Sequence, residues 1–133
     1  MELVSVGHVE SSLRDRDDAP KQGDEGAPEA WLVIAPEFGA ALDGIAAGDE
    51  LLLLTWLDRA LRDVLQVRPR SRTTGPVQGV FSTRSPDRPN PIGLHRVTVL
   101  ELDGERVRVD QLEALDGTPI VDLKPLLRTI DER

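Results

Sequence analysis

Apolar residues recur along this chain in short runs of the length typical of β-strands. The runs predict strands at Leu3–Glu10, Glu29–Pro36 and Asp49–Leu57. In the last of these, residues 51–54 are consecutive leucines. A continuous apolar run between charged residues is typical of a strand that is buried on both faces. We therefore expect the third strand to lie inside the fold.

Other segments follow different patterns. Glu37–Ile45 is predicted to form a short amphipathic helix that covers one end of the sheet, because its apolar residues stand at i, i+3, i+4 and i+7 (Phe38, Ala41, Leu42 and Ile45). Residues 58–65 suggest one further helical turn. Residues 11–28 are polar and contain two prolines and two glycines, which predicts a long loop.

Two turn signals lie between apolar stretches in the second half of the chain. Asp103 and Gly104 stand between alternating valines, which predicts a two-residue hairpin. Asp116–Pro119 lies between Leu112–Leu115 and Ile120–Leu123, and predicts a second hairpin. Two hairpins, a buried strand and little helix predict an all-β fold, a small antiparallel barrel with one or two short helices. We expect a single domain over residues 1–133, since this length is typical of one domain.

Residues 79–94, GVFSTRSPDRPNPIGL, differ from the rest because three prolines fall within six residues. Proline fixes its own φ and favours an extended conformation in the residue before it, so this segment is stiff without being helix or strand. Apolar residues at its two ends are expected to anchor it in the core (Val80, Phe81, Ile92 and Leu94). A rigid loop that displays polar groups suits a binding site. The alternative is a proline-braced surface turn.

Charge is unevenly distributed along the chain. The net charge is −8, yet residues 67–98 contain 6 arginines and 1 aspartate, a local charge of +5. These arginines either pair with carboxylates elsewhere or form a surface for phosphate or carboxylate, which guanidinium groups bind well. An acidic chain is not typical of a general nucleic-acid-binding protein.

Composition excludes several kinds of chemistry. There is no cysteine, and the only histidines are His8 and His95, so disulfides, thiolate chemistry and a zinc site are not expected. We interpret both histidines as ordinary strand residues. No apolar stretch is long enough to span a membrane and no secretory leader is visible, so we expect an intracellular, cytoplasmic protein that does not bind membranes.

Common enzyme motifs are also absent. Glycine-rich nucleotide-binding motifs, the nucleophile elbow and the zinc-binding helix motif do not occur, which excludes the dinucleotide-binding architecture of most methyltransferases. Among the remaining polar clusters, Asp116 and Gly117 are also what a tight turn requires. Asp122 and Lys124 alternate around Leu123, so they face the same side and can form an ion pair.

Residues 79–94 closely resemble the signature of the TsaA-like family, also called TrmO or YaeB-like. Similar segments occur in the family's order over nearly the whole chain: VGHV at 6–9, LVIAP at 32–36, VRP at 67–69 and LDGTPIVDLKP at 115–125. The resemblance implies a small β-barrel that binds S-adenosylmethionine, usually as a homodimer with the cofactor near the subunit interface. It also implies methylation of N6 of threonylcarbamoyl-modified adenosine beside the anticodon of tRNA.

The resemblance further implies which residues contact the cofactor. By position these are Pro20, Lys21, Gln22, Asp58, Arg59, Arg84, Leu94, Asp116, Gly117, Thr118 and Pro119. For catalysis we expect Arg84 and Asn90 to hold polar groups of cofactor or substrate, and Asp122 and Lys124 to shape the site or handle a proton. No metal is expected.

Two alternatives to a methyltransferase remain open. The first is a module that binds S-adenosylmethionine as a sensor or store without transferring its methyl group. The acidic net charge favours it, as does the small number of aromatic residues available for base stacking, 2 Trp and 2 Phe. The second is a dimerising barrel whose signature loop is purely structural, which predicts no affinity for the cofactor.

Overall fold

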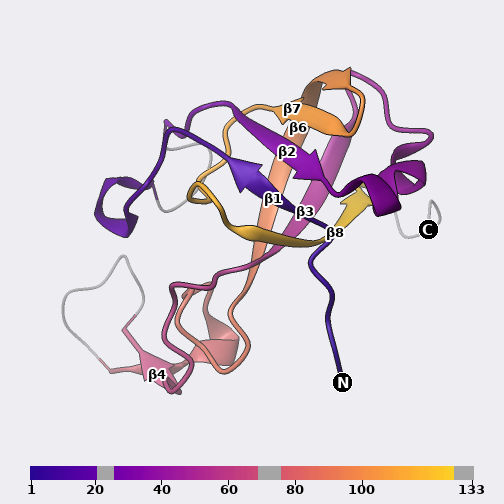
Figure 1. The fold of residues 1–133 in the computed structure, drawn as a ribbon. Coiled ribbons are helices and arrows are strands. Elements are labelled where there is room, and N and C mark those ends of the chain that lie inside the picture. The colour runs from indigo at the N-terminus through magenta and orange to yellow at the C-terminus, as the bar shows by residue number, and fades with distance from the viewer. Residues whose placement is uncertain (21–25, 69–75, 128–133) are drawn as a thin grey trace.

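The computed structural model describes residues 1–20, 26–68 and 76–127. Within them, six strands close into an antiparallel barrel in the order β1-β2-β7-β6-β3-β8, and β4 and β5 pair separately (Figure 1). The barrel strands are β1 (Gly7–Glu10), β2 (Ala30–Ile34), β3 (Glu50–Trp56), β6 (Ile92–Asp103), β7 (Arg106–Val109) and β8 (Pro119–Pro125), and the separate pair is β4 (Gln66–Val67) and β5 (Gln78–Gly79). The predicted all-β class and small antiparallel barrel are confirmed.

The two turn signals have different outcomes. The first hairpin is confirmed, because β6 and β7 pair antiparallel around a turn in which Gly104 has a φ of 61°. At the second, the turn is present, with Gly117 at a φ of 83°. The prediction of a second hairpin is wrong, because residues 112–115 are irregular and β8 pairs with β1 and β3 instead. Leu112 is drawn into the core, where its side chain is fully buried.

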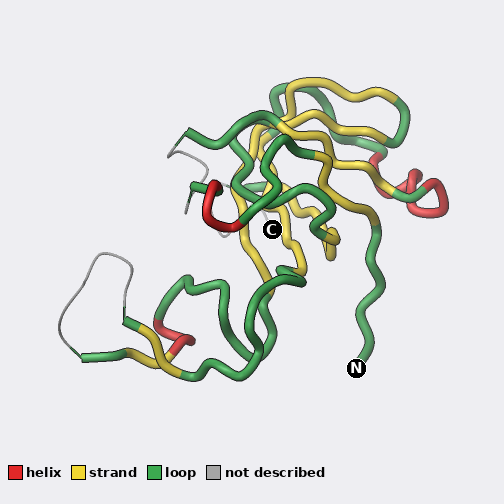
Figure 2. The backbone as a smooth tube through the Cα atoms, turned by 60° about the vertical axis from the view of Figure 1, so that its left-hand side comes forward, coloured by secondary structure: helices red, strands yellow, loops and turns green. Residues whose placement is uncertain are grey.

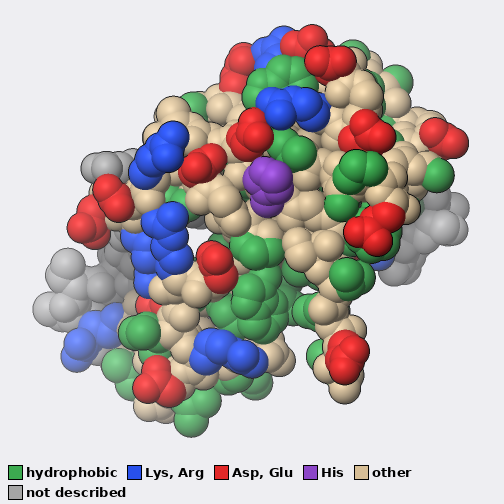
Figure 3. All heavy atoms as spheres, viewed as in Figure 1, with side chains coloured by type: hydrophobic (Ala, Val, Ile, Leu, Met, Phe, Trp, Pro, Cys, Tyr) green, Lys and Arg blue, Asp and Glu red, His purple; other side chains and the backbone are tan. Residues whose placement is uncertain are grey.

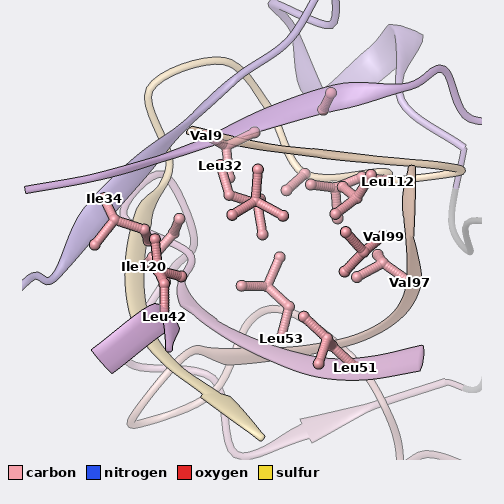
Figure 4. Close-up of a cluster of buried hydrophobic side chains, with 14 residues drawn as sticks. Val9, Leu32, Ile34, Leu42, Leu51, Leu53, Val97, Val99, Leu112 and Ile120 are labelled. Carbon is pink, nitrogen blue, oxygen red and sulfur yellow. The ribbon is translucent and has the colours of Figure 1, made fainter. Parts of the chain in front are cut away.

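Alternate residues of the barrel strands point into an aliphatic core (Figure 4). Its fully buried members include Val9, Leu32, Leu53, Val107, Leu112 and Ile120. A barrel buries only one face of each strand, and β3 accordingly alternates between buried and half-buried positions. The prediction that β3 is buried on both faces is therefore wrong, because Leu52 and Leu54 lie on the outer face.

The predicted amphipathic helix is present as a 3-10 helix, η3 (Pro36–Leu42). Leu42 joins the core, and Phe38 and Ile45 pack against it, so the segment covers the core as expected. Two shorter 3-10 helices are η1 (Arg16–Asp18) and η4 (Val80–Ser82). Residues 58–65 form turns rather than helix, and the first strand begins only at Gly7.

Between β3 and β6, residues 57–68 and 76–91 leave the barrel and form a projecting arm that carries β4, β5 and η4 (Figures 1 and 2). Val80 is buried, as predicted. The other three expected anchors are not, because Phe81 is 83% exposed, Ile92 41% and Leu94 45%. Phe81 lies on the arm, which extends away from the barrel, and Ile92 and Leu94 occupy outward-facing positions of β6, so none of the three reaches the core.

Candidate functional site

The arm is held in shape by polar side chains rather than by an apolar core. The Arg88 guanidinium donates hydrogen bonds to the carbonyl oxygens of Ser85 (2.7 Å), Val80 (2.8 Å) and Thr83 (2.5 Å). Thr83 Oγ1 donates to Val80 O at 2.9 Å and accepts from the Ser85 N–H at 3.2 Å. Arg88 is therefore a structural residue, and it fixes the backbone on both sides of Arg84.

A second set of contacts joins the arm to the loop that carries η1. Arg16 Nη2 lies 3.3 Å from the Asp87 carboxylate, and Arg16 Nη1 donates to the Arg59 carbonyl at 3.4 Å. The Arg59 guanidinium donates in return to the carbonyl of Arg14. Asp87 also accepts the backbone N–H of Leu61 at 2.9 Å. These contacts turn the loop and the arm into one continuous wall.

An open groove of about 1620 Å³ runs between this wall, β6 and residues 110–115. The predicted residues that line it are Pro20, Asp58, Arg59, Arg84, Leu94 and Thr118. In Figure 3, hydrophobic side chains gather where the arm leaves the barrel, with Lys and Arg side chains beside them. The groove thus combines charged and apolar surface.

Arg84 and Asp58 are two charged side chains of the groove. Within the described part of the chain, neither Arg84 nor Asp58 makes a hydrogen bond or an ion pair, and both are exposed. An unpaired guanidinium is available to a carboxylate or phosphate, and an unpaired carboxylate is available to a cation. Leu94 lies in the same groove, where it offers apolar surface.

The arginines of residues 67–98 differ in their partners. Arg88 bonds carbonyl oxygens of the arm, and Arg96 pairs with Glu50 at 2.6 Å. Arg84 alone among these three has no partner in the described residues. Arg70 and Arg72 lie outside those residues. The +5 segment therefore contains both structural arginines and a guanidinium that is free to bind an anion.

One polar cluster of the groove was missed by the sequence reasoning. His95 is buried on the inner face of β6; its Nε2 lies 2.7 Å from Thr55 Oγ1, and its Nδ1 is hydrogen-bonded to Glu113. His95 has the same strand parity as the core residues Val97 and Val99, so alternation already indicated an inward histidine. Its identification as an ordinary strand residue overlooked that signal.

Three of the proposed catalytic residues lie outside the groove. Asn90 Oδ1 accepts a hydrogen bond from Arg62 at 3.0 Å, and the Arg62 guanidinium stacks 5.1 Å from the centre of the Trp56 ring. Asp122 and Lys124 stand on the outer face of β8, where they form the predicted ion pair at 3.1 Å. Arg84 is the one proposed catalytic residue that lines the groove.

The Asp116–Pro119 turn connects the barrel to the loop after β1. Asp116 Oδ1 accepts the backbone N–H of Ser11 at 3.0 Å, and its backbone N–H donates to Leu13 O at 2.7 Å. The Thr118 hydroxyl is buried and donates to Leu115 O at 2.7 Å. Of this predicted set only Thr118 reaches the groove, and Pro119 belongs to β8. Lys21 and Gln22 lie outside the described residues.

A smaller depression, of about 710 Å³, is lined in part by Asp116, Gly117 and Trp31. Two of the arginines beside it are paired. Arg106 bonds Glu10 at 2.9 Å and stacks 4.9 Å from the centre of the Trp31 ring. The hydrogen bonds that Arg108 donates to Glu101 and then to Glu29 raise the pKa of Arg108 above its ordinary value. We interpret this surface as a set of exposed ion pairs, which contribute little individually.

No helix in the described residues is long and apolar enough to cross a membrane. In the same residues, no group of three or more His, Asp or Glu side chains is placed to hold a metal ion.

Comparisons with known proteins agree with this architecture. The family described as "tRNA-methyltransferase O N-terminal domain" matches residues 8–132. A "Probable S-adenosyl-L-methionine-binding protein" of Methanothermobacter thermautotrophicus is 46% identical over 126 residues, which cover 95% of this chain and 90% of the relative. An "S-adenosyl-L-methionine-binding protein" of Archaeoglobus fulgidus is 40% identical over 131 residues, 98% of this chain and 93% of the relative.

Solved structures share the fold. The crystal structure of TrmO from Pseudomonas aeruginosa superimposes with a TM-score of 0.75 at 27% identity and covers all of this chain. This chain spans 60% of the length of that protein. The match over residues 8–132, together with the two relatives, shows that the chain belongs to the tRNA-methyltransferase O family, through its N-terminal domain.

Proposed function

We propose that this protein is a cytoplasmic, S-adenosylmethionine-dependent methyltransferase that modifies N6 of threonylcarbamoyl-modified adenosine beside the anticodon of tRNA. Its family and the names of its relatives support this proposal. The single observation that carries it is structural: Arg84, at the centre of the signature, has no partner among the described residues and lines the groove.

The groove matches the chemistry of the cofactor. S-adenosylmethionine carries a carboxylate, an ammonium, a sulfonium and an adenine ring. Arg84 suits the carboxylate and Asp58 suits a cationic centre, while Leu57 and Leu94 offer apolar surface. A few convergent polar groups on apolar surface are expected of a cofactor site.

Methyl transfer depends more on how the two reactants are positioned than on a strong acid or base. The N6 nitrogen attacks the methyl carbon in line with its bond to sulfur, that bond breaks, and S-adenosylhomocysteine leaves as N6 loses its proton. Holding the two reactants in line converts a bimolecular step into one within a complex. A strong base is not obligatory, which is consistent with a groove that holds the cofactor through Arg84.

The substrate is proposed to be RNA, and its backbone would meet the arginines of the arm. Neutralising phosphates with arginine releases counterions, so the affinity for tRNA should fall steeply as salt increases. An affinity that does not change with salt would contradict this part of the proposal.

We propose that the active form is a homodimer. Large apolar side chains remain exposed on the arm and on β6, namely Leu61 (57%), Leu65 (67%), Val77 (46%), Phe81 (83%), Ile92 (41%) and Leu94 (45%). Exposed apolar patches are typical of interfaces. Strand pairing places Leu54 between Leu94 and Asp122 on the outer face of the barrel. A second copy on this face would bring Asp122 and Lys124 close to the groove.

Methyl transfer is the decisive test of the enzyme proposal. The purified protein is incubated with methyl-labelled S-adenosylmethionine and with tRNA that carries threonylcarbamoyl-adenosine but not the N6-methyl group. We expect label on that nucleoside, identified by mass spectrometry after digestion, and none with unmodified tRNA. Cofactor binding without any transfer would overturn the proposed enzyme activity.

A specific observation favours one alternative, a module that binds S-adenosylmethionine without methylating tRNA. In the described residues, no Phe, Tyr or Trp side chain lines the groove. Recognition of an unstacked base usually uses an aromatic face. The same labelling experiment separates the two functions, because a sensor or store binds the cofactor and leaves tRNA unlabelled.

A further inference from the structure

His95 connects the barrel to the floor of the groove through both of its ring nitrogens. Nδ1 is hydrogen-bonded to Oε1 of Glu113, and Nε2 lies 2.7 Å from Thr55 Oγ1. An ionised carboxylate can only accept, so Nδ1 carries a hydrogen, and in the neutral ring the Thr55 hydroxyl donates to Nε2. These two contacts fix the plane of the imidazole ring.

The signature segment makes room for this ring. Gly93 lies on the inner face of β6, and a Cβ built there would lie 2.7 Å from His95 Nε2 and would overlap Thr55 Oγ1. Only glycine leaves the space that the hydrogen bond between His95 and Thr55 occupies. The end of the signature is thus physically coupled to the position of His95.

The loop that presents Glu113 is held equally firmly. The backbone N–H of Thr98 donates to Asp110 Oδ1 at 2.7 Å, and the backbone N–H of Asp110 donates to Thr98 O at 3.1 Å. Leu112 is fully buried, and its N–H donates to Pro28 O at 3.0 Å. Between them, Gln111 has a φ of 40°, a left-handed conformation that non-glycine residues rarely adopt. Such strain persists only where the surroundings impose it, and it clusters at functional sites.

Glu113 is therefore a carboxylate on a rigid support. Its side chain is 17% exposed and lines the groove, and His95 is its one hydrogen-bond partner in the described residues. Oε2 receives no hydrogen bond from those residues. A mostly buried carboxylate is costly unless it is paired, so an oxygen left open at the groove favours a cation.

We propose that Glu113 binds a cationic centre of the ligand in the groove, and that His95 is the positioning residue that aims its carboxylate. This inference rests on the proposed binding of S-adenosylmethionine. That molecule offers two cationic centres, the α-ammonium and the sulfonium. Arg84 would take its carboxylate, and Glu113 would select for positive charge at one of these two centres.

Three ligands test the inference by calorimetric titration. S-adenosylmethionine has both cationic centres, S-adenosylhomocysteine has only the ammonium, and 5′-methylthioadenosine has neither. In Glu113→Gln we expect the affinity for S-adenosylmethionine to fall by about tenfold or more, the range for a lost charged hydrogen bond. The affinity for 5′-methylthioadenosine should stay the same. A parallel loss for S-adenosylhomocysteine identifies the ammonium as the partner, and an unchanged value identifies the sulfonium.

Variants of His95 test the positioning role. His95→Asn retains an N–H at the position of Nδ1, the ring nitrogen that bonds Glu113, and should keep most of the selectivity for S-adenosylmethionine over 5′-methylthioadenosine. His95→Leu should lose that selectivity while still binding 5′-methylthioadenosine. His8→Asn and Glu37→Gln are matched controls at exposed positions outside the groove and should behave like the wild type.

The possible failures are distinguishable. If Glu113→Gln binds S-adenosylmethionine as tightly as the wild type, the inference is wrong and the proposed function stands. If 5′-methylthioadenosine loses as much affinity as S-adenosylmethionine, Glu113 supports the shape of the groove and does not recognise charge, which also overturns the inference. If the wild type binds no S-adenosylmethionine, the proposed function and this inference fall together.

Discussion

The barrel and the arm are built on different physical principles. In the barrel, alternate side chains of six strands fill one aliphatic core, and residues such as Leu32 and Leu53 are fully buried. In the arm, Arg88 and Asp87 hold the backbone through hydrogen bonds, while Leu65 and Phe81 remain mostly exposed. The barrel is therefore stabilised by its own apolar core, whereas the arm is a polar scaffold whose apolar side chains are exposed.

This difference explains where the candidate site lies. A tightly packed core offers little space for a ligand, and a loop held by hydrogen bonds can display unpaired groups such as Arg84. The groove forms where the two regions meet, with the arm on one side and β6 and Glu113 on the other. The following variants test the contrast.

The largest effect is expected in the barrel core. Leu53→Ala should lower the free energy of unfolding by about 2–5 kcal/mol, because it removes buried methyl groups and leaves a cavity. Leu65→Ala, on the arm and 67% exposed, should change it by less than about 0.5 kcal/mol. Urea unfolding measures both values. Equal losses would show that the arm has an apolar core of its own.

The two phenylalanines of the chain give the next contrast. Phe38 packs against the barrel core, so Phe38→Ala should cost about 1–3 kcal/mol of stability. Phe81 is 83% exposed, so Phe81→Ala should leave monomer stability unchanged and weaken self-association. Unfolding curves and sedimentation velocity measure the two effects. A wild-type protein that is monomeric at every concentration would contradict the proposed homodimer.

Arg88→Lys tests the polar scaffold of the arm. A lysine cannot reproduce the planar fork that bonds the carbonyl oxygens of Ser85, Val80 and Thr83. We expect faster amide exchange in residues 79–91, equivalent to about 1–2 kcal/mol of local stability, with unchanged protection in the barrel strands. Uniformly faster exchange through the barrel would mean that the two regions are not independent.

The smallest effect is expected at the ion pair on β8. Lys124 is mostly exposed and lies 3.1 Å from Asp122. Lys124→Ala should therefore change the free energy of unfolding by less than about 0.5 kcal/mol. A loss above about 1 kcal/mol, measured by urea unfolding, would show that the pair supports the barrel.

Most of the barrel could be predicted because strand alternation and turn residues act locally. The valines around Gly104 gave the β6–β7 hairpin, and Gly117 marked a turn that is present. Which apolar residues of a strand point outward could not be predicted in the same way. The leucines of β3 are equally apolar at inward and outward positions, so their composition does not show that Leu52 and Leu54 lie outside the core.

Only part of the candidate site could be predicted from the sequence, for a related reason. Arg84 and Leu94 could be placed by resemblance, and both line the groove. The network of Thr55, His95 and Glu113 depends on three segments far apart in sequence, so no local motif reveals it. Phe81 was expected in the core because hydrophobicity shows that a side chain prefers burial and does not show which surface covers it.

The central claim, that the groove beside Arg84 binds S-adenosylmethionine, is tested most directly by calorimetric titration of the wild type and of Arg84→Ala. Arg84 is exposed and has no partner in the described residues, so the variant should unfold like the wild type. Arg14→Ala, at an exposed arginine outside the groove, is the matched control. We predict saturable binding in the wild type and the control, and its loss in Arg84→Ala. Wild-type affinity in Arg84→Ala would contradict the assignment of this groove as the cofactor site.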